Sequence, residues 1–375
     1  MEIRKIDDQT SLQIKYCRFI CIFFMCIVHI PPGLGAVDSM PSYLQAINVF
    51  LADILGRASV TALSFISGFL IVHNYANNDN SNYQKWLNVV VNRLKSLIVP
   101  MVFWNGAIIV IGFGILAATG VSIQVIDDLE GLDAFQIVFL RLLGFFNGSS
   151  SESLNFLHDI FACAFLSPIL IWLAKRISWL LVVLLLLIDN TITFQPVVTR
   201  GIILVFFGLG IVYCYRFNDF KPIHNIKWLT LALSVAVLVR EYWLAFNGVD
   251  IFDVPGYQTI KRFAVSAVAI YAAYLLTQTR FNHWIGKLDK STYFIFLAHN
   301  VFFILTWGAW QLFFGKDLEF PYIVYFFIVT PAWFVIAILS HQIIAYLPAF
   351  LQILITGKPR NSVKKHAIES IKKPA

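Results

Sequence analysis

The chain has 375 residues, of which 59% are hydrophobic and 13% are charged, and its mean hydropathy is +0.75. A soluble domain carries about a quarter charged residues, so this composition excludes an ordinary soluble enzyme, a disordered chain and a disulfide scaffold. The formal net charge is +7 at pH 7. Six basic residues against one acidic residue lie between 358 and 375. Such a segment is typical of a cytoplasmic tail beside anionic lipid and not of a nucleic-acid site.

Apolar runs separated by polar breaks predict ten membrane-spanning helices, because one span needs about 20 apolar residues. They lie, in chain order, near residues 13–31, 57–75, 97–118, 153–174, 178–189, 199–215, 227–246, 260–278, 291–314 and 321–347. We therefore expect an all-α polytopic integral membrane protein, with a membrane domain at 1–350 and a basic cytoplasmic tail at 351–375. The stretch 133–146 is too short to span and is expected in the interface or as a re-entrant segment.

Lys and Arg in the connections indicate the orientation of the spans, because cytoplasmic loops are rich in both. The basic residues of the inner connections are Arg4, Lys5, Lys15, Lys85, Arg93, Lys95, Lys175, Arg176, Arg216, Lys221, Lys227, Arg280, Lys287 and Lys290. The acidic residues of the outer connections are Asp38, Asp53, Asp127, Asp128, Glu130, Asp133, Asp250 and Asp253, with Arg141 as a lone base in the second connection. Both termini are therefore expected in the cytoplasm, which requires an even number of spans.

Two ionisable residues, Arg18 and His29, lie in the first apolar run, where each costs at least about 2.5 kcal/mol to insert. Eleven helical steps are about three turns, so both project from one face and stand roughly 16 Å apart along the axis. A guanidinium binds phosphates bidentately, and an imidazole is a general base near neutral pH. This spacing fits a CoA thioester anchored at Arg18 with its carbonyl near His29. The alternatives are an Arg18 that reaches lipid headgroups and a His29 satisfied by a neighbouring helix.

Further polar residues in or beside the spans have a functional and a structural interpretation. Arg93 and Lys95 either bind the CoA phosphates or anchor a helix end on the cytoplasmic side. His158 and Asp159 either handle the acceptor hydroxyl or form an interfacial polar cap. His299, a second intramembrane histidine, either contacts the substrate or is packed and hydrogen-bonded, and we expect the packed state.

Other features favour purely structural interpretations. Ser67 and Gly68 predict a close-packing notch between helices and not a nucleophilic serine, because no base stands at a fixed spacing. Arg240 and Glu241 predict a buried structural ion pair. The five cysteines form neither a metal motif nor a disulfide pattern, so they are expected to be small buried apolar residues.

Several motifs follow one another in a fixed order along the chain. The pattern Arg18-x10-His29 is followed by the run Phe65-Ile66-Ser67-Gly68-Phe69-Leu70. The others are Arg57, Arg93 to Pro100 with Trp104, Asn155 to Asp159 with Pro168, and Thr292 to His299. From about residue 15 to 300 the chain resembles the membrane-bound acyltransferase family 3, bacterial O-acyltransferases of surface polysaccharides.

The resemblance implies an enzyme of the bacterial inner membrane that moves an acyl group from cytoplasmic acyl-CoA to a hydroxyl of a surface polysaccharide, an exopolysaccharide or a lipid-linked precursor. Arg18, His29 and Arg93 carry over as functional residues, and no metal is expected. His29 would deprotonate the acceptor or transiently carry the acyl group. Acetyl is the default group, and succinyl is the alternative because some relatives of similar size transfer it. A succinyl carboxylate would need a further cation, for which Arg57 and Arg262 are the candidates.

Departures from the family pattern keep other interpretations open. Ser96 stands where the family has a second Arg, and Asn155 and His158 replace its Trp and Arg, which puts the acceptor and the acyl group in doubt. A multi-span transporter or flippase would also line a path with intramembrane Arg and His, although no repeat between halves is visible. A different membrane acyltransferase fold would centre on His299 with Asn300 beside it.

Overall fold

The structure is a computed structural model that describes residues 5–33, 40–76, 82–120, 122–191, 195, 197–246, 256–279, 282–315, 318 and 320–359. The major helices are α1 (Asp8–Val28), α3 (Arg57–Ala76), α4 (Asn82–Arg93), α5 (Val99–Thr119), α8 (Asn155–Ile177), α9 (Trp179–Thr191), α10 (Gly201–Arg216), α12 (Lys227–Phe246), α13 (Tyr257–Thr277), α14 (Asn282–Phe314) and α15 (Phe320–Ile344). Shorter segments are α2 (Ser42–Asn48), η2 (Val49–Gly56), η3 (Leu94–Ile98), α6 (Gln124–Asp127), α7 (Ala134–Gln136), η4 (Ile137–Leu142), η5 (Phe145–Asn147), η6 (Glu152–Leu154), α11 (Lys221–Asn225) and α16 (Ala349–Thr356). Within the described residues all regular structure is helical, as the fold class predicted.

Each of the ten predicted spans coincides with one of the major helices, namely α1, α3, α5, α8, α9, α10, α12, α13, α14 and α15. By length and apolar composition, seven helical stretches of the described chain can cross a membrane, and α9 and α10 are shorter apolar helices. An all-α polytopic membrane protein is thereby confirmed, whereas the count of ten and the cytoplasmic termini stay predictions. The short helices α7 and η4 occupy the stretch predicted not to span. Asp38, Asp250, Asp253, Arg280 and the tail from residue 360 lie outside the described residues.

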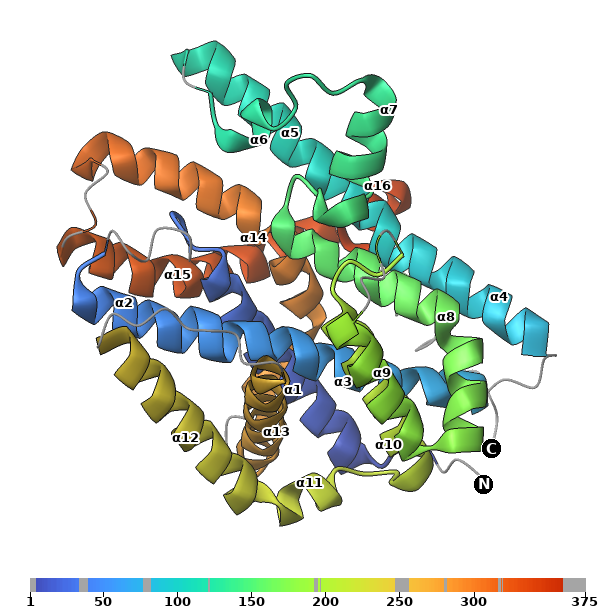
Figure 1. Cartoon of the computed structure of the whole chain (residues 1–375). Helices are drawn as coiled ribbons and strands as arrows, with labels where there is room; N and C mark the ends of the chain where they lie inside the picture. The colour runs from blue at the N-terminus through green and yellow to red at the C-terminus, as the bar shows by residue number, and fades with distance from the viewer. Residues whose placement is uncertain are drawn as a thin grey trace.

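Helix α1 lies at the centre of the molecule, packed against α3, α13, α14 and η2 (Figure 1). The outer helices present large apolar side chains to the surroundings, as Leu229 and Trp243 of α12 and Val335 of α15 do. In water such a surface would be unfavourable, whereas lipid tails accept it. All five cysteines are buried and unbridged, as expected.

Helices α3 and α10 pack with their backbones in contact, because each helix has a glycine, without a side chain, where the two cross. A Cβ on Gly68 would stand 2.0 Å from the Phe207 carbonyl oxygen, and one on Gly210 would stand 2.1 Å from that of Phe65. Ser67 donates a hydrogen bond to the Leu63 carbonyl within its own helix, at 2.8 Å. The predicted close-packing notch is confirmed, and it holds the start of α3 beside the start of α10.

The C-terminal helix α16 packs across the start of α5, so the domain boundary expected at residue 350 falls inside this helix. The Trp104 indole donates to the Ile355 carbonyl at 3.0 Å. Gly357 ends α16 with φ of 72°, and a Cβ there would stand 2.6 Å from the Ser96 carbonyl oxygen. This close approach fixes the residue that follows, Lys358, against η3.

Candidate active site

A cavity of about 270 Å³ lies at the C-terminal end of α1. Five parts of the chain line it: the end of α1, the start of α3, the start of α8 with η6, the segment leading into α10, and α13. Its polar lining residues are His29, Arg57, Glu152, Ser153, Arg200 and Arg262. Of the sequence candidates, the structure therefore brings His29, Arg57 and Arg262 together.

His29 is the residue at which α1 ends, with its backbone N–H bonded to the Cys26 carbonyl at 3.0 Å. Its ring centroid lies 5.4 Å from that of His299, which comes from α14. His299 is fully buried, and its Nδ1 is bonded to the Phe296 carbonyl. A carbonyl only accepts, so Nδ1 carries the proton and Nε2 is a bare acceptor that lacks a partner among the described residues. His299 is thus packed and hydrogen-bonded as predicted, and the His29 ring lies between it and the cavity.

Two of the three arginines of the cavity are paired with carboxylates behind its wall. Arg57 Nη1 lies 2.9 Å from Asp53 Oδ1, and Arg200 Nε lies 3.3 Å from Asp159 Oδ2. Asp159 is fully buried and Asp53 is 15% exposed, so these carboxylates do not line the cavity. Arg200 Nη2 and Arg262 Nε are buried and have no hydrogen-bond partner in the described part of the chain. Ion pairs thus position Arg57 and Arg200, and Arg200 and Arg262 each keep a donor that a ligand could use.

Asp159 anchors the segment that carries Arg200. Its Oδ1 accepts from the Thr199 backbone N–H at 2.7 Å and from the Thr199 hydroxyl at 2.8 Å. His158 Nδ1 lies 3.6 Å from Oδ1 of the same carboxylate, and its ring packs edge-on against Phe145. Neither His158 nor Asp159 lines the cavity, so the structure gives both a supporting place behind it.

A chain of buried charges supports Arg57 from the other side. Lys261 of α13 is 2% exposed, with Nζ 2.8 Å from Asp53 and 3.7 Å from Glu241 of α12. Glu241 also accepts from the Tyr257 hydroxyl at 2.6 Å and lies 3.5 Å from Arg240. The predicted pair of Arg240 and Glu241 is present, and it belongs to a network that ends at the cavity. Buried charges need such partners because unpaired ones are costly.

The N-terminal half of α1 carries a second group of cations. Arg18 lies close enough to Arg93 to interact electrostatically, and Arg93 lies near the Tyr293 hydroxyl. That hydroxyl donates to the Ser96 carbonyl at 2.7 Å, which joins α14 to η3. Lys95 is exposed, and no contact in the described residues connects its side chain with the other two. The structure thus brings together two of the three residues predicted for the CoA phosphates.

Lys358 joins this group from the C-terminal segment. Its pKa is lowered from the ordinary value, first by partial burial and then by the positive charges of Arg93 and Arg18. Three cations in one place are suited to a ligand with several phosphate charges. The side chain comes from the segment expected as a tail, and sequence spacing has no means of placing it there.

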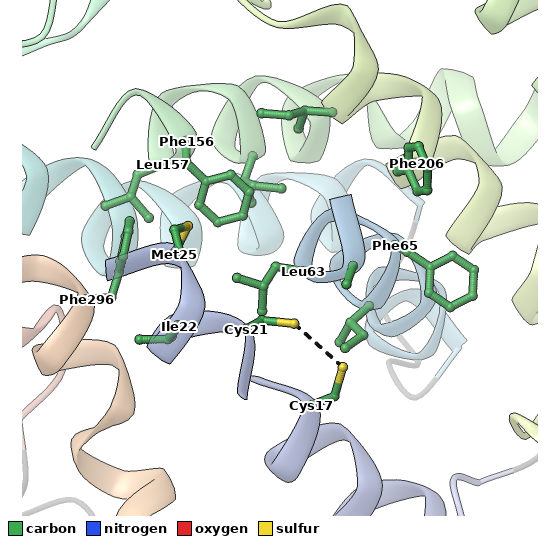
Figure 2. Packing of buried hydrophobic residues seen from close by; sticks show 14 of the residues in the cluster. Cys17, Cys21, Ile22, Met25, Leu63, Phe65, Phe156, Leu157, Phe206 and Phe296 are labelled. Carbon is green, nitrogen blue, oxygen red and sulfur yellow. Dashed lines mark hydrogen bonds between the residues drawn. The ribbon is translucent and has the colours of Figure 1, made fainter. Parts of the chain in front are cut away.

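Packed apolar side chains fill the stretch of α1 between the two groups. Figure 2 shows Ile22 and Met25 of α1 near Leu157 of α8 and Phe296 of α14. Arg18 lies within α1 and His29 caps its end, so eleven helical steps, or about 16 Å, separate them. The molecule therefore has two polar sites along one helix, with a closely packed apolar region between them.

Sequence reasoning missed Arg200, which lines the cavity and is paired with Asp159 behind it. The signal was available: Arg200 precedes the sixth span on the side where the connections are otherwise acidic. A basic residue among the mostly acidic outer connections indicates a carboxylate partner nearby, and this partner is Asp159. Glu152, which also lines the cavity, carried no sequence signal of its own.

The fold and the site define a helical membrane protein with a His and Arg cavity at the end of its central helix. Residues 11–342 match the family model described as "Acyltransferase domain", Acyl_transf_3, and the chain belongs to this family. It is 25% identical, over 97% of its length and 96% of the relative's, to "Succinoglycan biosynthesis protein ExoH" of Rhizobium meliloti (strain 1021). No solved structure matches it significantly. The protein is therefore an acyltransferase.

Proposed function

We propose that this acyltransferase moves an acyl group, acetyl or succinyl, from cytoplasmic acyl-CoA to a hydroxyl of an exported polysaccharide or its lipid-linked precursor in the bacterial inner membrane. The observation that carries the proposal is the arrangement on α1, where cations gather at Arg18 and a polar cavity opens at His29. The polysaccharide acceptor is supported by the relative, whose name places it in succinoglycan biosynthesis.

The donor would lie along α1. Arg18, Arg93 and Lys358 would hold the phosphates of CoA by charge-assisted hydrogen bonds. About 16 Å of helix then separates these phosphates from His29, a distance that an extended phosphopantetheine arm covers. Because the region between is closely packed, the arm would have to displace side chains such as Met25 and Phe296.

The transfer step needs one base and no further reactant. The acceptor hydroxyl gives its proton to His29 as its oxygen attacks the thioester carbonyl, so that a C–O bond forms. The C–S bond then breaks, and the proton passes from His29 to the departing thiolate, which leaves as CoA thiol. Donors on the neighbouring arginines would stabilise the negative charge that develops on the carbonyl oxygen.

Mass spectrometry of the host polysaccharide with and without the gene tests the function. We expect the polysaccharide of the deletion strain to lose one kind of acyl group, and the mass lost names that group. Wild-type membranes should also consume acyl-CoA when the polysaccharide is added. A glycan transporter would consume none, and that result would reject the proposal.

His29 and His299 separate two site assignments within the acyltransferase class. We expect His29→Ala to abolish transfer and His299→Ala to reduce it in part, because His299 lies one ring further from the cavity. His224→Ala, a change in the short helix α11, is the matched control. Full transfer by the His29 variant together with a dead His299 variant would move the site to α14.

A further inference from the structure

The cavity beside His29 has more positive charge on its wall than the acyl transfer itself requires. Three guanidinium groups line it, those of Arg57, Arg200 and Arg262, against the single carboxylate of Glu152. Glu152 forms no ion pair with any of them in the described residues. Like charges gathered in a region of low dielectric repel one another strongly, so a bound anion would stabilise the group.

The arginines come from three separate elements and converge on one space. Arg57 begins α3, Arg200 precedes α10, and Arg262 lies in the second turn of α13. Their neighbours Asp53 and Asp159 fix two of them from outside the wall, and Asp189 lies near Arg262. Arg200 Nη2 and Arg262 Nε are buried there, and neither has a hydrogen-bond partner among the described residues.

We infer that Arg57, Arg200 and Arg262 form a carboxylate-binding subsite that recognises a charged group of the reacting substrates next to His29. This inference rests on the proposed function for its substrates. A guanidinium presents planar, paired donors that match a carboxylate, and several such donors in one small cavity give both affinity and orientation. The cavity, at about 270 Å³, is smaller than most ligand pockets, which begin near 300 Å³. It therefore suits a short acyl chain and part of a sugar ring.

Two substrates can supply the carboxylate. One is the distal carboxylate of a dicarboxylic acyl group such as succinyl, which the arginines would hold while the thioester carbonyl faces His29. The other is an acidic sugar of the acceptor, which would orient the hydroxyl that is acylated. Both carboxylates would bind through the same chemistry. Kinetics with two acyl donors and two acceptors tell them apart.

Binding to the purified, full-length protein tests the subsite without turnover. Succinate should raise the melting temperature of the wild type and of the control Arg176→Gln, an exposed arginine at the end of α8 that is remote from the cavity. Arg262→Gln should lose the shift, and the neutral analogue succinamide should give none. Equal shifts in wild type and Arg262→Gln, or a shift with succinamide as large as with succinate, would overturn the inference. If Arg262→Gln fails to fold, Arg57→Gln replaces it, because that side chain is already 47% exposed.

Kinetics with two donors and two acceptors identify the source. If the carboxylate is on the acyl group, Arg262→Gln should lower kcat/KM for succinyl-CoA by about 10- to 100-fold and leave acetyl-CoA within about twofold. If the carboxylate is on the acceptor, kcat/KM should fall for both donors. Reduction of the acidic sugars of the acceptor to neutral sugars should then lower kcat/KM of the wild type to the level of the variant. Equal losses with every donor and acceptor, or no loss, would contradict a carboxylate subsite. A wild type that transfers nothing rejects the proposed function, and the succinate arm then still decides the subsite.

Discussion

The two ends of α1 hold their cations in opposite ways. At the His29 end, Arg57 and Arg200 each have a carboxylate within 3.3 Å behind them, and Lys261 extends the pairing to Glu241. At the other end, Arg93 and Lys358 form no ion pair in the described part of the chain, and both interact electrostatically with Arg18. Charges that are paired in the free protein have fixed positions, whereas charges without carboxylates stay available to a highly charged ligand.

This difference assigns distinct work to the two regions. Reacting groups must be positioned closely for transfer, and a rigid, paired network achieves this at a cost in desolvation. A phosphate clamp needs net positive charge more than exact geometry, so partially exposed cations near the surface suffice. We therefore expect changes at the His29 end to affect catalysis and stability, and changes at the Arg18 end to affect the KM for acyl-CoA.

The largest effect is expected for His29→Ala. Removal of a general base costs about 10²- to 10⁴-fold in rate, so kcat should fall by that factor with little change in KM for acyl-CoA. Acyl-CoA consumption by membranes that contain equal amounts of each protein measures it. A rise in KM at unchanged kcat would place His29 in donor binding and would remove the contrast between the two ends.

The next effect in size is expected for Asp159→Asn, and it concerns stability. The change leaves Arg200 without its buried countercharge, and because the Arg200 side chain is 35% exposed, the cost should be below the roughly 3 kcal/mol of a fully buried pair. The melting temperature of the detergent-purified protein should fall clearly. Asp219→Asn is the control, because the Asp219 carboxylate is 31% exposed and its ion pair is with the exposed Lys221. Equal melting temperatures for both variants would show that the pairing behind the cavity is energetically unimportant.

A smaller effect is expected for Arg93→Ala at the other end. Loss of a charge-assisted bond to phosphate should raise the KM for acyl-CoA by about 10- to 100-fold and leave kcat nearly unchanged, because the contact is equal in ground and transition states. Lys95→Ala, an exposed neighbour without contacts to this group, should change the KM by less than about threefold. If Lys95→Ala has the larger effect, the phosphates bind further out than the structure indicates.

The smallest effect is expected for Lys358, and it concerns how the KM for acyl-CoA depends on pH. Burial and the nearby arginines lower its pKa below the ordinary 10.5, so the side chain loses its charge at a lower pH than other lysines. Because the charged form binds phosphate, the affinity for acyl-CoA should fall as the pH rises toward that ordinary value. Lys358→Arg stays charged and should flatten the rise in KM with pH. Identical pH profiles for both proteins would exclude Lys358 from the donor site.

Local periodicity accounts for the parts of the site that could be predicted. Arg18 and His29 share one helix, and helical geometry alone relates residues that are eleven positions apart. The notch at Gly68 was also predictable, because small residues in a span have few other uses. The pairing of Arg240 with Glu241 followed from two opposite charges in one apolar run, although Lys261 and Asp53 as further members did not.

By itself the sequence determined the class of the protein, its ten apolar segments and the separation of Arg18 from His29, because hydropathy and helical repeat are local properties. Only the tertiary structure decided that Arg57, Arg200 and Arg262 meet around His29, since they lie on three elements whose approach depends on backbone contacts such as Gly68 with Phe207. It also decided that Lys358 belongs with Arg18 and Arg93, because α16 docks on α5 through contacts between residues distant in the chain.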